Sequence, residues 1–84
     1  MHYLYILKSL KDLGYYIGIT DNVPKRLKDH NRDKTRSTKN RVPFVIKYAE
    51  KFNTKREARQ REIFLKRNCQ ARKALLTKLG FTTK

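Results

Sequence analysis

The fold of this chain is organised around Gly14-Tyr15-Tyr16-Ile17-Gly18-Ile19-Thr20, which is followed at once by Asp21-Asn22-Val23-Pro24-Lys25-Arg26. The β-branched and aromatic run between two glycines predicts a strand. Asp21 and Asn22 are helix-capping residues and proline suits a first helical turn, so a helix should begin where the strand ends. Alternate strand residues share a face, which places Tyr16, Gly18 and Thr20 together just before the helix N-terminus. A phenol, a bare backbone and a hydroxyl on one face predict a functional site.

The composition indicates one small basic domain, spanning residues 1–84. The chain carries 22 lysines and arginines against 7 acidic residues, a formal net charge of +15. Such an excess of positive charge favours a polyanionic partner. Nucleic acid is favoured over a membrane surface, because no basic amphipathic helix with a clean face of bulky apolar residues is present.

Several classes of protein are disfavoured by the sequence. Cys69 is the only cysteine, which excludes an internal disulfide and a cysteine-based zinc site. The stretch from Met1 to Lys8 is too short and too polar for a signal peptide. No apolar run approaches the ~20 residues that cross a bilayer. We therefore expect a cytoplasmic protein, either free or associated with the nucleoid.

Periodicity and capping signals predict the order β-β-α-β-α-α. Strands are expected at 3–7, 15–20 and 44–52, with the first two forming an antiparallel hairpin. Helices are expected from 23 to about 31, from a capping box at Thr54 and Glu57 to a break near 68–70, and from there to a stop at Gly80. The expected fold class is α+β, with helices covering a small three-stranded mixed or antiparallel sheet.

The helical faces carry polar residues where apolar ones are expected. Val23, Arg26, Leu27 and His30 share one face of the first helix, and Glu62 interrupts the stripe of Ala58, Leu65 and Cys69 in the second. We expect Leu65 in the core and Cys69 as an inert packing residue beside it. In the last helix, the residues expected to face inward are Ala71, Ala74, Leu75 and Leu79.

Five residues place a reactive polar group where the pattern requires core or close packing: Tyr5, Tyr16, Arg26, His30 and Glu62. Their arrangement resembles the GIY-YIG nuclease domain. It matches in Tyr3-Leu4-Tyr5, in Tyr16-Ile17-Gly18 eleven residues after Tyr5, and in Arg26 ten residues after Tyr16. Tyr3-Leu4 stands where the family name has Gly-Ile, a departure that we interpret as a subfamily trait.

The resemblance covers nearly the whole chain and is strongest to the small stand-alone bacterial members. That domain is related to the N-terminal nuclease of the excision-repair incision subunit. The matching blocks lie in order at the family spacing, and they are Tyr3 to Ser9, Tyr16 to Thr20, Arg26 to Asn31, Ser37 to Phe44, and Glu62 to Lys66.

The resemblance implies a metal-dependent endonuclease that hydrolyses DNA phosphodiester bonds by attack of water, without a covalent intermediate. Glu62 would hold one Mg²⁺ (or Mn²⁺) ion, and Arg26 would bind the phosphate and stabilise charge in the transition state. Tyr5 would act as general base or orient the water, with Tyr16 beside it. His30 would either relay a proton or contact phosphate.

The basic loop from Arg32 to Pro43 is a second candidate region. Contact with nucleic acid is expected from Gly18, Ser37, Thr38, Lys39 and Arg41. The alternative is a solvated loop, with Gly18 as a simple bulge. The partner is expected to be DNA, and RNA stays open.

Each catalytic assignment has a structural alternative. Tyr5 and Tyr16 would then be packing residues, Arg26 a snorkelling side chain and His30 a satisfied core histidine. Glu62 would pair with Arg59 or Lys66, its neighbours on the helix. Two functional alternatives follow from them: a basic nucleic-acid-binding protein that keeps the nuclease fold without catalysis, and a basic module that delivers a protein partner to DNA.

Overall fold

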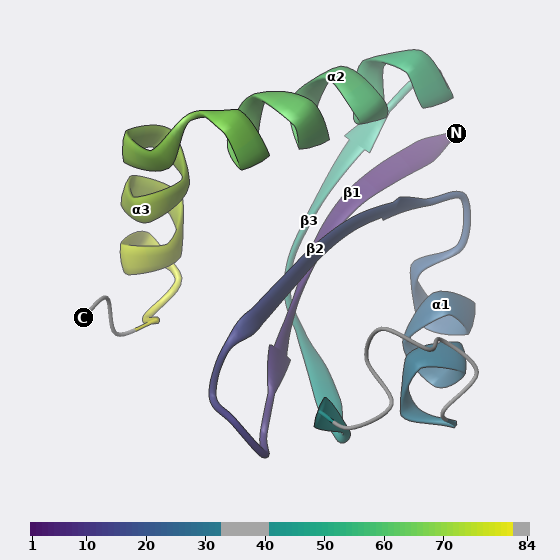
Figure 1. Cartoon of the computed structure of the whole chain (residues 1–84). Coiled ribbons are helices and arrows are strands. Elements are labelled where there is room, and N and C mark those ends of the chain that lie inside the picture. The colour runs from purple at the N-terminus through teal and green to yellow at the C-terminus, as the bar shows by residue number, and fades with distance from the viewer. Residues whose placement is uncertain (33–40, 82–84) are drawn as a thin grey trace.

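The computed structural model describes residues 1–32 and 41–81. It contains three strands and three helices in the predicted order, and the α+β class is confirmed (Figure 1). The elements are β1 (His2–Ser9), β2 (Tyr15–Thr20), α1 (Val23–Asn31), β3 (Phe44–Phe52), α2 (Lys55–Arg67) and α3 (Cys69–Lys78).

The three strands form one sheet in the order β2-β1-β3, and both pairings are antiparallel. Of the two arrangements expected, the sheet is therefore antiparallel throughout. β1 takes the central position, and its residues from Leu4 to Leu7 are all buried. A central strand is covered on both faces, which explains why this segment is a continuous apolar run.

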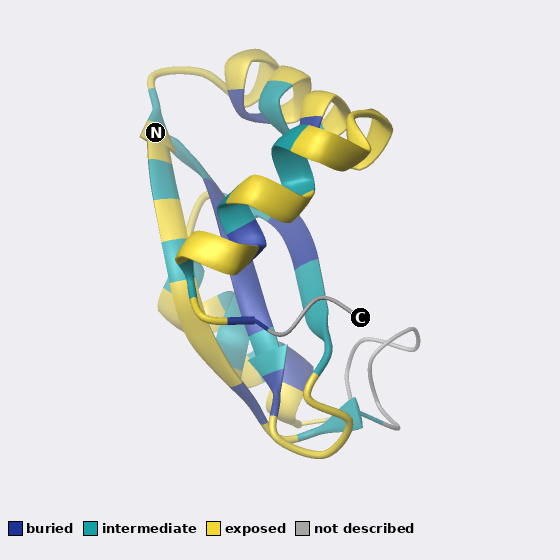
Figure 2. Cartoon of the chain, turned by 90° about the vertical axis from the view of Figure 1, so that its left-hand side faces the viewer, coloured by how far each residue is buried: buried dark blue, intermediate teal, exposed yellow. Residues whose placement is uncertain are grey.

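Helices cover both faces of the sheet, and the strand residues alternate between them. Leu4, Ile6 and Ile17 pack in one cluster with Leu65 of α2 and Leu76 of α3. On the other face, Tyr5, Leu7 and Phe44 form a second cluster, against which Tyr16, Val23 and Leu27 pack. The expected alternation in β1 and β2 is therefore confirmed. The buried residues lie under the helices, and the outer surfaces of α2 and α3 are largely exposed (Figure 2).

Side-chain caps determine where each helix begins. The Asn22 carboxamide oxygen accepts the N–H of Lys25, and Pro24 lies in the first turn of α1. At the start of α2, the Thr54 hydroxyl oxygen accepts the N–H of Glu57 at 3.2 Å and donates to the Glu57 carboxylate at 3.1 Å. The cap is thus formed as predicted, but the Glu57 side chain contacts the Thr54 hydroxyl and not the backbone N–H that a capping box would use.

The break between α2 and α3 corrects two expectations about packing. Asn68 has an extended backbone and caps α3, so the periodicity of α2 stops before Cys69, which is exposed and is not a packing residue. In α3, Ala71, Leu75 and Leu79 pack against the core as predicted, but Ala74 is exposed and the buried residue of this helix is Leu76. Phe81 folds back and donates its N–H to the carbonyl of Leu76, which completes that side of the core. Leu65 is in the core, as predicted.

The turn between β1 and β2 is closed by side chains. The buried Ser9 hydroxyl oxygen accepts the N–H groups of Lys11 and Asp12 and donates to the carbonyl of Arg41. The left-handed backbone conformation falls on Leu13 (φ +63°) and not on the glycine that follows it.

None of the helices within residues 1–32 and 41–81 has the length and apolar character to cross a membrane.

Candidate active site

Four of the five predicted catalytic residues meet on the face of the sheet that α1 covers. Tyr5 comes from β1, Tyr16 from β2, and Arg26 and His30 from α1. The Tyr5 hydroxyl lies 3.0 Å from His30 Nε2, and Arg26 Nε donates to the same hydroxyl oxygen at 3.4 Å. The Tyr16 ring packs edge-on against His30, with ring centroids 4.8 Å apart. A hydrogen-bonded series thus runs from Arg26 through Tyr5 to His30.

The register of the hairpin creates the space for this series. Tyr5 lies directly opposite Gly18, and Leu7 lies opposite Tyr16, so the two tyrosines are diagonal neighbours on one face. A Cβ atom on Gly18 would lie 2.6 Å from the Tyr5 hydroxyl oxygen and 2.8 Å from the adjacent ring carbon. The glycine therefore makes room for the phenol. Its contact with nucleic acid stays a prediction.

Burial and Arg26 act in opposite directions on Tyr5. The side chain is 1% exposed, and desolvation raises the pKa of the phenol above its usual value. The hydrogen bond from Arg26 opposes this rise in pKa, while the nearby charges of Tyr16 and Glu62 add to it. Tyr5 is therefore protonated at neutral pH. Because a guanidinium only donates, the Tyr5 oxygen accepts from Arg26, and its own proton can be donated to His30 Nε2 in the tautomer that is protonated at Nδ1.

His30 is a fully buried neutral imidazole. Desolvation, followed by the positive charge of Arg26, lowers its pKa to about 4, and the carboxylate of Asp29 opposes this shift. The Phe44 ring, 5.8 Å away between centroids, packs against the imidazole. Full burial leaves the imidazole no exposed surface for direct phosphate contact, and its role as a proton relay stays a prediction.

Asn31 is a positioning residue that we did not single out from the sequence. Its Nδ2 donates to the carbonyl of Phe44 at 3.1 Å, and its Oδ1 accepts the N–H of Phe44 at 2.6 Å. This pair of bonds fastens the end of α1 to the start of β3 and so holds the neighbouring His30 under the sheet. The sequence offered only one signal for this role, a polar residue at a helix end. It did not identify the partner, which lies thirteen residues away.

Glu62, the fifth predicted residue, lies on α2, which covers the other face of the sheet. Its side chain is 16% exposed and forms an ion pair with Lys66 at 3.2 Å. Ala58 and Leu65 form the buried seam of α2, and Arg61 on one side of that seam binds Glu50 of β3. With ~100° per residue, Glu62 lies on the opposite side of the seam, toward β2. Its charge adds a minor part to the raised pKa of Tyr5, after burial and the effects of Arg26 and Tyr16, and its own ion pair is to Lys66.

The donor set around Glu62 is small. No group of three or more histidine, cysteine, aspartate or glutamate side chains that could hold a metal is present in the described part of the chain. A single carboxylate fits an ion such as Mg²⁺ that keeps most of its water ligands. The ion pair with Lys66, one of the two structural alternatives predicted for Glu62, is also present.

Arg41 is engaged in contacts within the protein. Its Nε lies 2.6 Å from Asp12 Oδ2, its Nη2 donates to the carbonyl of Tyr15, and its guanidinium packs on the Phe44 ring. The hydrogen bonds from Arg41 and from the Gly14 N–H lower the pKa of Asp12 to about 2. Arg41 thus fastens the β1–β2 turn to the start of β3. Its contact with nucleic acid stays a prediction, and Ser37, Thr38 and Lys39 lie outside the described residues.

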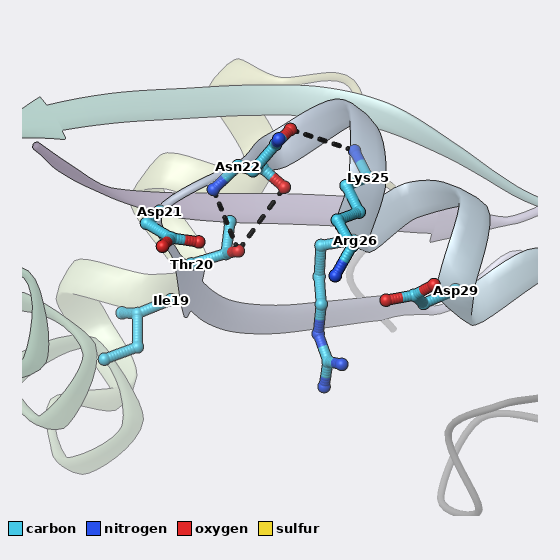
Figure 3. A pocket seen from close by; sticks show the side chains of 7 residues that line it. All are labelled: Ile19, Thr20, Asp21, Asn22, Lys25, Arg26 and Asp29. Carbon is cyan, nitrogen blue, oxygen red and sulfur yellow. Dashed lines mark hydrogen bonds between the residues drawn. The ribbon is translucent and has the colours of Figure 1, made fainter.

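A hollow of about 270 Å³ lies beside Arg26, between the end of β2 and the first turns of α1 (Figure 3). Thr20 shapes its rim, because the Thr20 hydroxyl oxygen accepts the N–H of Asn22 at 3.1 Å. The Arg26 guanidinium extends away from the helix axis, with Asp29 on the next turn. The residues that line the hollow are Ile19, Thr20, Asp21, Asn22, Lys25, Arg26 and Asp29.

The chain matches the family model of the GIY-YIG catalytic domain over residues 1–74. A UPF0213 protein of Bacillus licheniformis is 48% identical over 67 residues, which cover 79% of this chain and 68% of that protein. UPF0213 protein YazA of Bacillus subtilis is 41% identical over 75 residues, which cover 88% of this chain and 75% of that protein.

A solved structure is also similar. The solution NMR structure of a UPF0213 protein from Bacillus halodurans matches with a TM-score of 0.55 and 34% identity, over 95% of this chain and 85% of that one. The names of these relatives state no substrate, metal or reaction.

Proposed function

Because the chain belongs to the GIY-YIG family of nuclease domains, we propose that it is a metal-dependent endonuclease that hydrolyses DNA phosphodiester bonds. The observation that supports this proposal is the hydrogen-bonded series Arg26–Tyr5–His30, assembled from a strand and a helix at a point where sheet packing alone needs no polar group. Burial of a polar group costs free energy, so such groups are retained where they are hydrogen-bonded and serve a function.

In the proposed reaction, Tyr5 is the general base toward the attacking water. As the Tyr5 oxygen takes a proton from water, its own proton passes to His30 Nε2, so that no isolated phenolate forms in the buried site. Arg26 donates to the Tyr5 oxygen through Nε and so holds the phenol in position for this transfer. The remaining guanidinium N–H groups are suited to bind phosphate oxygens, and they stabilise the charge that develops in the transition state.

Glu62 is the residue that we propose to hold the cofactor. When bound, one Mg²⁺ (or Mn²⁺) ion would neutralise charge on the phosphate and on the leaving oxygen. The adjacent Lys66 reduces the negative potential at the carboxylate, so we expect a weakly held ion that exchanges with solvent.

The net charge of +15 supports a polyanionic substrate bound through its phosphates. We propose DNA as that substrate, in the cytoplasm and in a repair context, in line with the resemblance to the excision-repair nuclease domain. One observation favours the non-catalytic alternative: Glu62 is already paired with Lys66 and could act as a structural residue of α2.

The decisive experiment compares cleavage and binding of labelled single-stranded, duplex and branched DNA, with Mg²⁺ and with excess chelator. Wild type should cut only with the metal. Glu62→Gln should reduce cutting by orders of magnitude while binding without metal persists, because only the carboxylate charge is removed. Arg26→Ala should abolish cutting and weaken binding.

Glu57→Gln is the matched control, since it removes an exposed carboxylate from the same helix. It should cut like wild type. Equal cutting in chelator would refute the metal-dependent mechanism, and a wild type that cuts no substrate would establish the non-catalytic alternative.

A further inference from the structure

One face of α2 carries a stripe of charged residues, which we call the α2 stripe: Lys55, Arg59, Glu62 and Lys66. Spacings of four, three and four residues align them along one side of the helix. Because Arg61 faces β3 through its ion pair with Glu50, the stripe lies on the β2 side of the buried seam. At 1.5 Å per residue it extends over about 16 Å, roughly the rise of five nucleotides in one strand of DNA.

The cations of the stripe differ in how they are engaged. Lys66 forms an ion pair with Glu62. Arg61, which lies outside the stripe, forms one with Glu50. Within the part of the chain that the structure describes, Lys55 and Arg59 make no ion pair, and both are exposed. Two solvated cations on the same helix face as the candidate metal ligand are thus available to an anion.

The surface continues from the stripe to Arg26. Lys55 lines a hollow of about 240 Å³ together with His2 and the end of β2. This hollow shares Ile19, Thr20 and Asp21 with the hollow beside Arg26. One continuous surface therefore leads from the start of α2, across the end of β2, to the guanidinium on α1.

We propose that Lys55 and Arg59 bind backbone phosphates of the DNA strand that is cut, next to the scissile phosphate. This inference rests on the proposed function, because it takes Arg26 and Glu62 as the place of cleavage. The arrangement sets two exposed cations on the N-terminal side of Glu62 along α2, and the surface continues from them toward Arg26. It also supplies a surface for binding the DNA backbone within the described residues, where the other candidate cation, Arg41, is held by Asp12.

The chain offers a matched control on the same helix. Arg56 and Arg67 are also exposed cations of α2, but the helical period turns them away from the sheet. The double variants Lys55→Ala/Arg59→Ala and Arg56→Ala/Arg67→Ala remove the same charge from the same element. Lys55→Gln/Arg59→Gln removes the charge but keeps a polar side chain at each position, and it serves as a second test. Far-ultraviolet circular dichroism checks that each variant is folded.

The measurement is binding of a fluorescent DNA duplex in chelator over a series of salt concentrations. Loss of the two stripe cations should weaken binding by at least tenfold at low salt. It should also make the slope of log affinity against log salt shallower by about 1.8, the value for two phosphate contacts. The Arg56/Arg67 variant should also weaken binding, but several-fold less than the stripe variant does, because it acts only by lowering the net charge. An equal effect of the two double variants, or no effect of the stripe variant, would overturn the proposal.

Failure of the proposed function is distinguishable from failure of this inference. If wild type cuts nothing but the stripe variants alone lose binding, the endonuclease proposal fails and the binding surface stands. If wild type cuts with Mg²⁺ and the stripe variants bind and cut like wild type, the surface is wrong and the endonuclease stands. An unlabelled RNA duplex as competitor measures whether the surface prefers DNA.

Discussion

At the scale of single residues, the Tyr5 hydroxyl is the point on which the site depends. It contacts His30 and Arg26 through hydrogen bonds and lies against the bare backbone of Gly18. The phenol ring is buried between β1 and α1, so its position is determined by packing and cannot adjust freely. Small changes around Tyr5 should therefore affect chemistry before they affect folding.

Gly18→Ala should displace Tyr5 from its partners. The new methyl group would lie 2.6 Å from the hydroxyl oxygen and 2.8 Å from a ring carbon, so the ring must move. We expect cleavage to fall at least 100-fold and the free energy of unfolding to fall by about 1–3 kcal/mol, the usual cost of overpacking. Cleavage assays and denaturant titration measure the two effects.

A double-mutant cycle with Tyr5→Ala provides the control for Gly18→Ala. Once the ring is removed, the alanine at position 18 should cost much less stability than it does in wild type. Wild-type cleavage by Gly18→Ala would contradict the assigned position of Tyr5.

His30 should make the protein sensitive to mild acid. Its pKa is lowered to about 4 in the folded state, whereas an unfolded histidine titrates near 6.5. The unfolded state therefore binds more protons between these values, so the stabilisation is complete above pH 6.5 and is lost as the pH falls toward 4. The full effect is worth roughly 3 kcal/mol.

Denaturant titrations at pH 7 and pH 4.5 test this dependence, with His30→Gln as the comparison. The variant should lose less stability over that interval than wild type, because its amide does not titrate. Equal losses in the two proteins would mean that other groups account for the acid sensitivity.

At the scale of elements, the rotation of α2 about its own axis places Glu62. The seam of Ala58 and Leu65 anchors the helix, and the ion pair of Arg61 with Glu50 holds its β3 side. The Tyr48 hydroxyl donates to the same carboxylate, which makes a small network between the sheet and the helix. Because Arg61 and Glu62 flank the seam, loss of this network should allow the helix to turn and should loosen the position of Glu62.

Arg61→Ala should lower the free energy of unfolding by about 1–2 kcal/mol, since the two side chains are 33% and 23% exposed and solvent screens part of their interaction. Cleavage should fall as well, and higher Mg²⁺ concentrations should restore part of it. A cycle with Glu50→Gln, followed by denaturant titration, measures the coupling. Arg56→Ala, on the outward face, should be nearly neutral, and an equal effect of the two arginine variants would exclude the network.

At the scale of the whole molecule, the net charge of +15 acts on folding and on binding in opposite directions. Repulsion among like charges destabilises the compact state, and salt screens that repulsion. DNA binding, by contrast, releases counterions and weakens as salt rises.

Raising the salt concentration from 20 to 200 mM should therefore raise the melting temperature by a few degrees while DNA affinity falls at least 100-fold, as expected when several phosphates are contacted. Thermal unfolding and fluorescence anisotropy in the same buffers measure the two trends. A chloride series and a glutamate series separate screening from specific anion binding. A melting temperature that falls with salt would show that ion pairs such as Arg41–Asp12 outweigh the overall repulsion.

Local signals in the sequence by itself determined the elements and much of their orientation. The caps at Asn22 and Thr54 and the stop at Gly80 depend on neighbours within a few residues, and strand alternation depends only on backbone geometry. The residue types and spacing around Tyr5 and Tyr16 were enough to identify the family. Each of these features is read within a short stretch of chain, which is why it could be predicted.

Only the tertiary structure decided which side chains meet. Tyr5 and His30 are 25 residues apart, and Arg41 finds Asp12 across 29 residues. Cys69 is exposed because of the way α3 docks after the break at Asn68. β3 pairs with β1 because β1 is apolar on both faces and is buried as the central strand. These contacts depend on strand order, register and helix rotation, which are set by the packing of the whole core and leave no mark in the spacing of neighbouring residues.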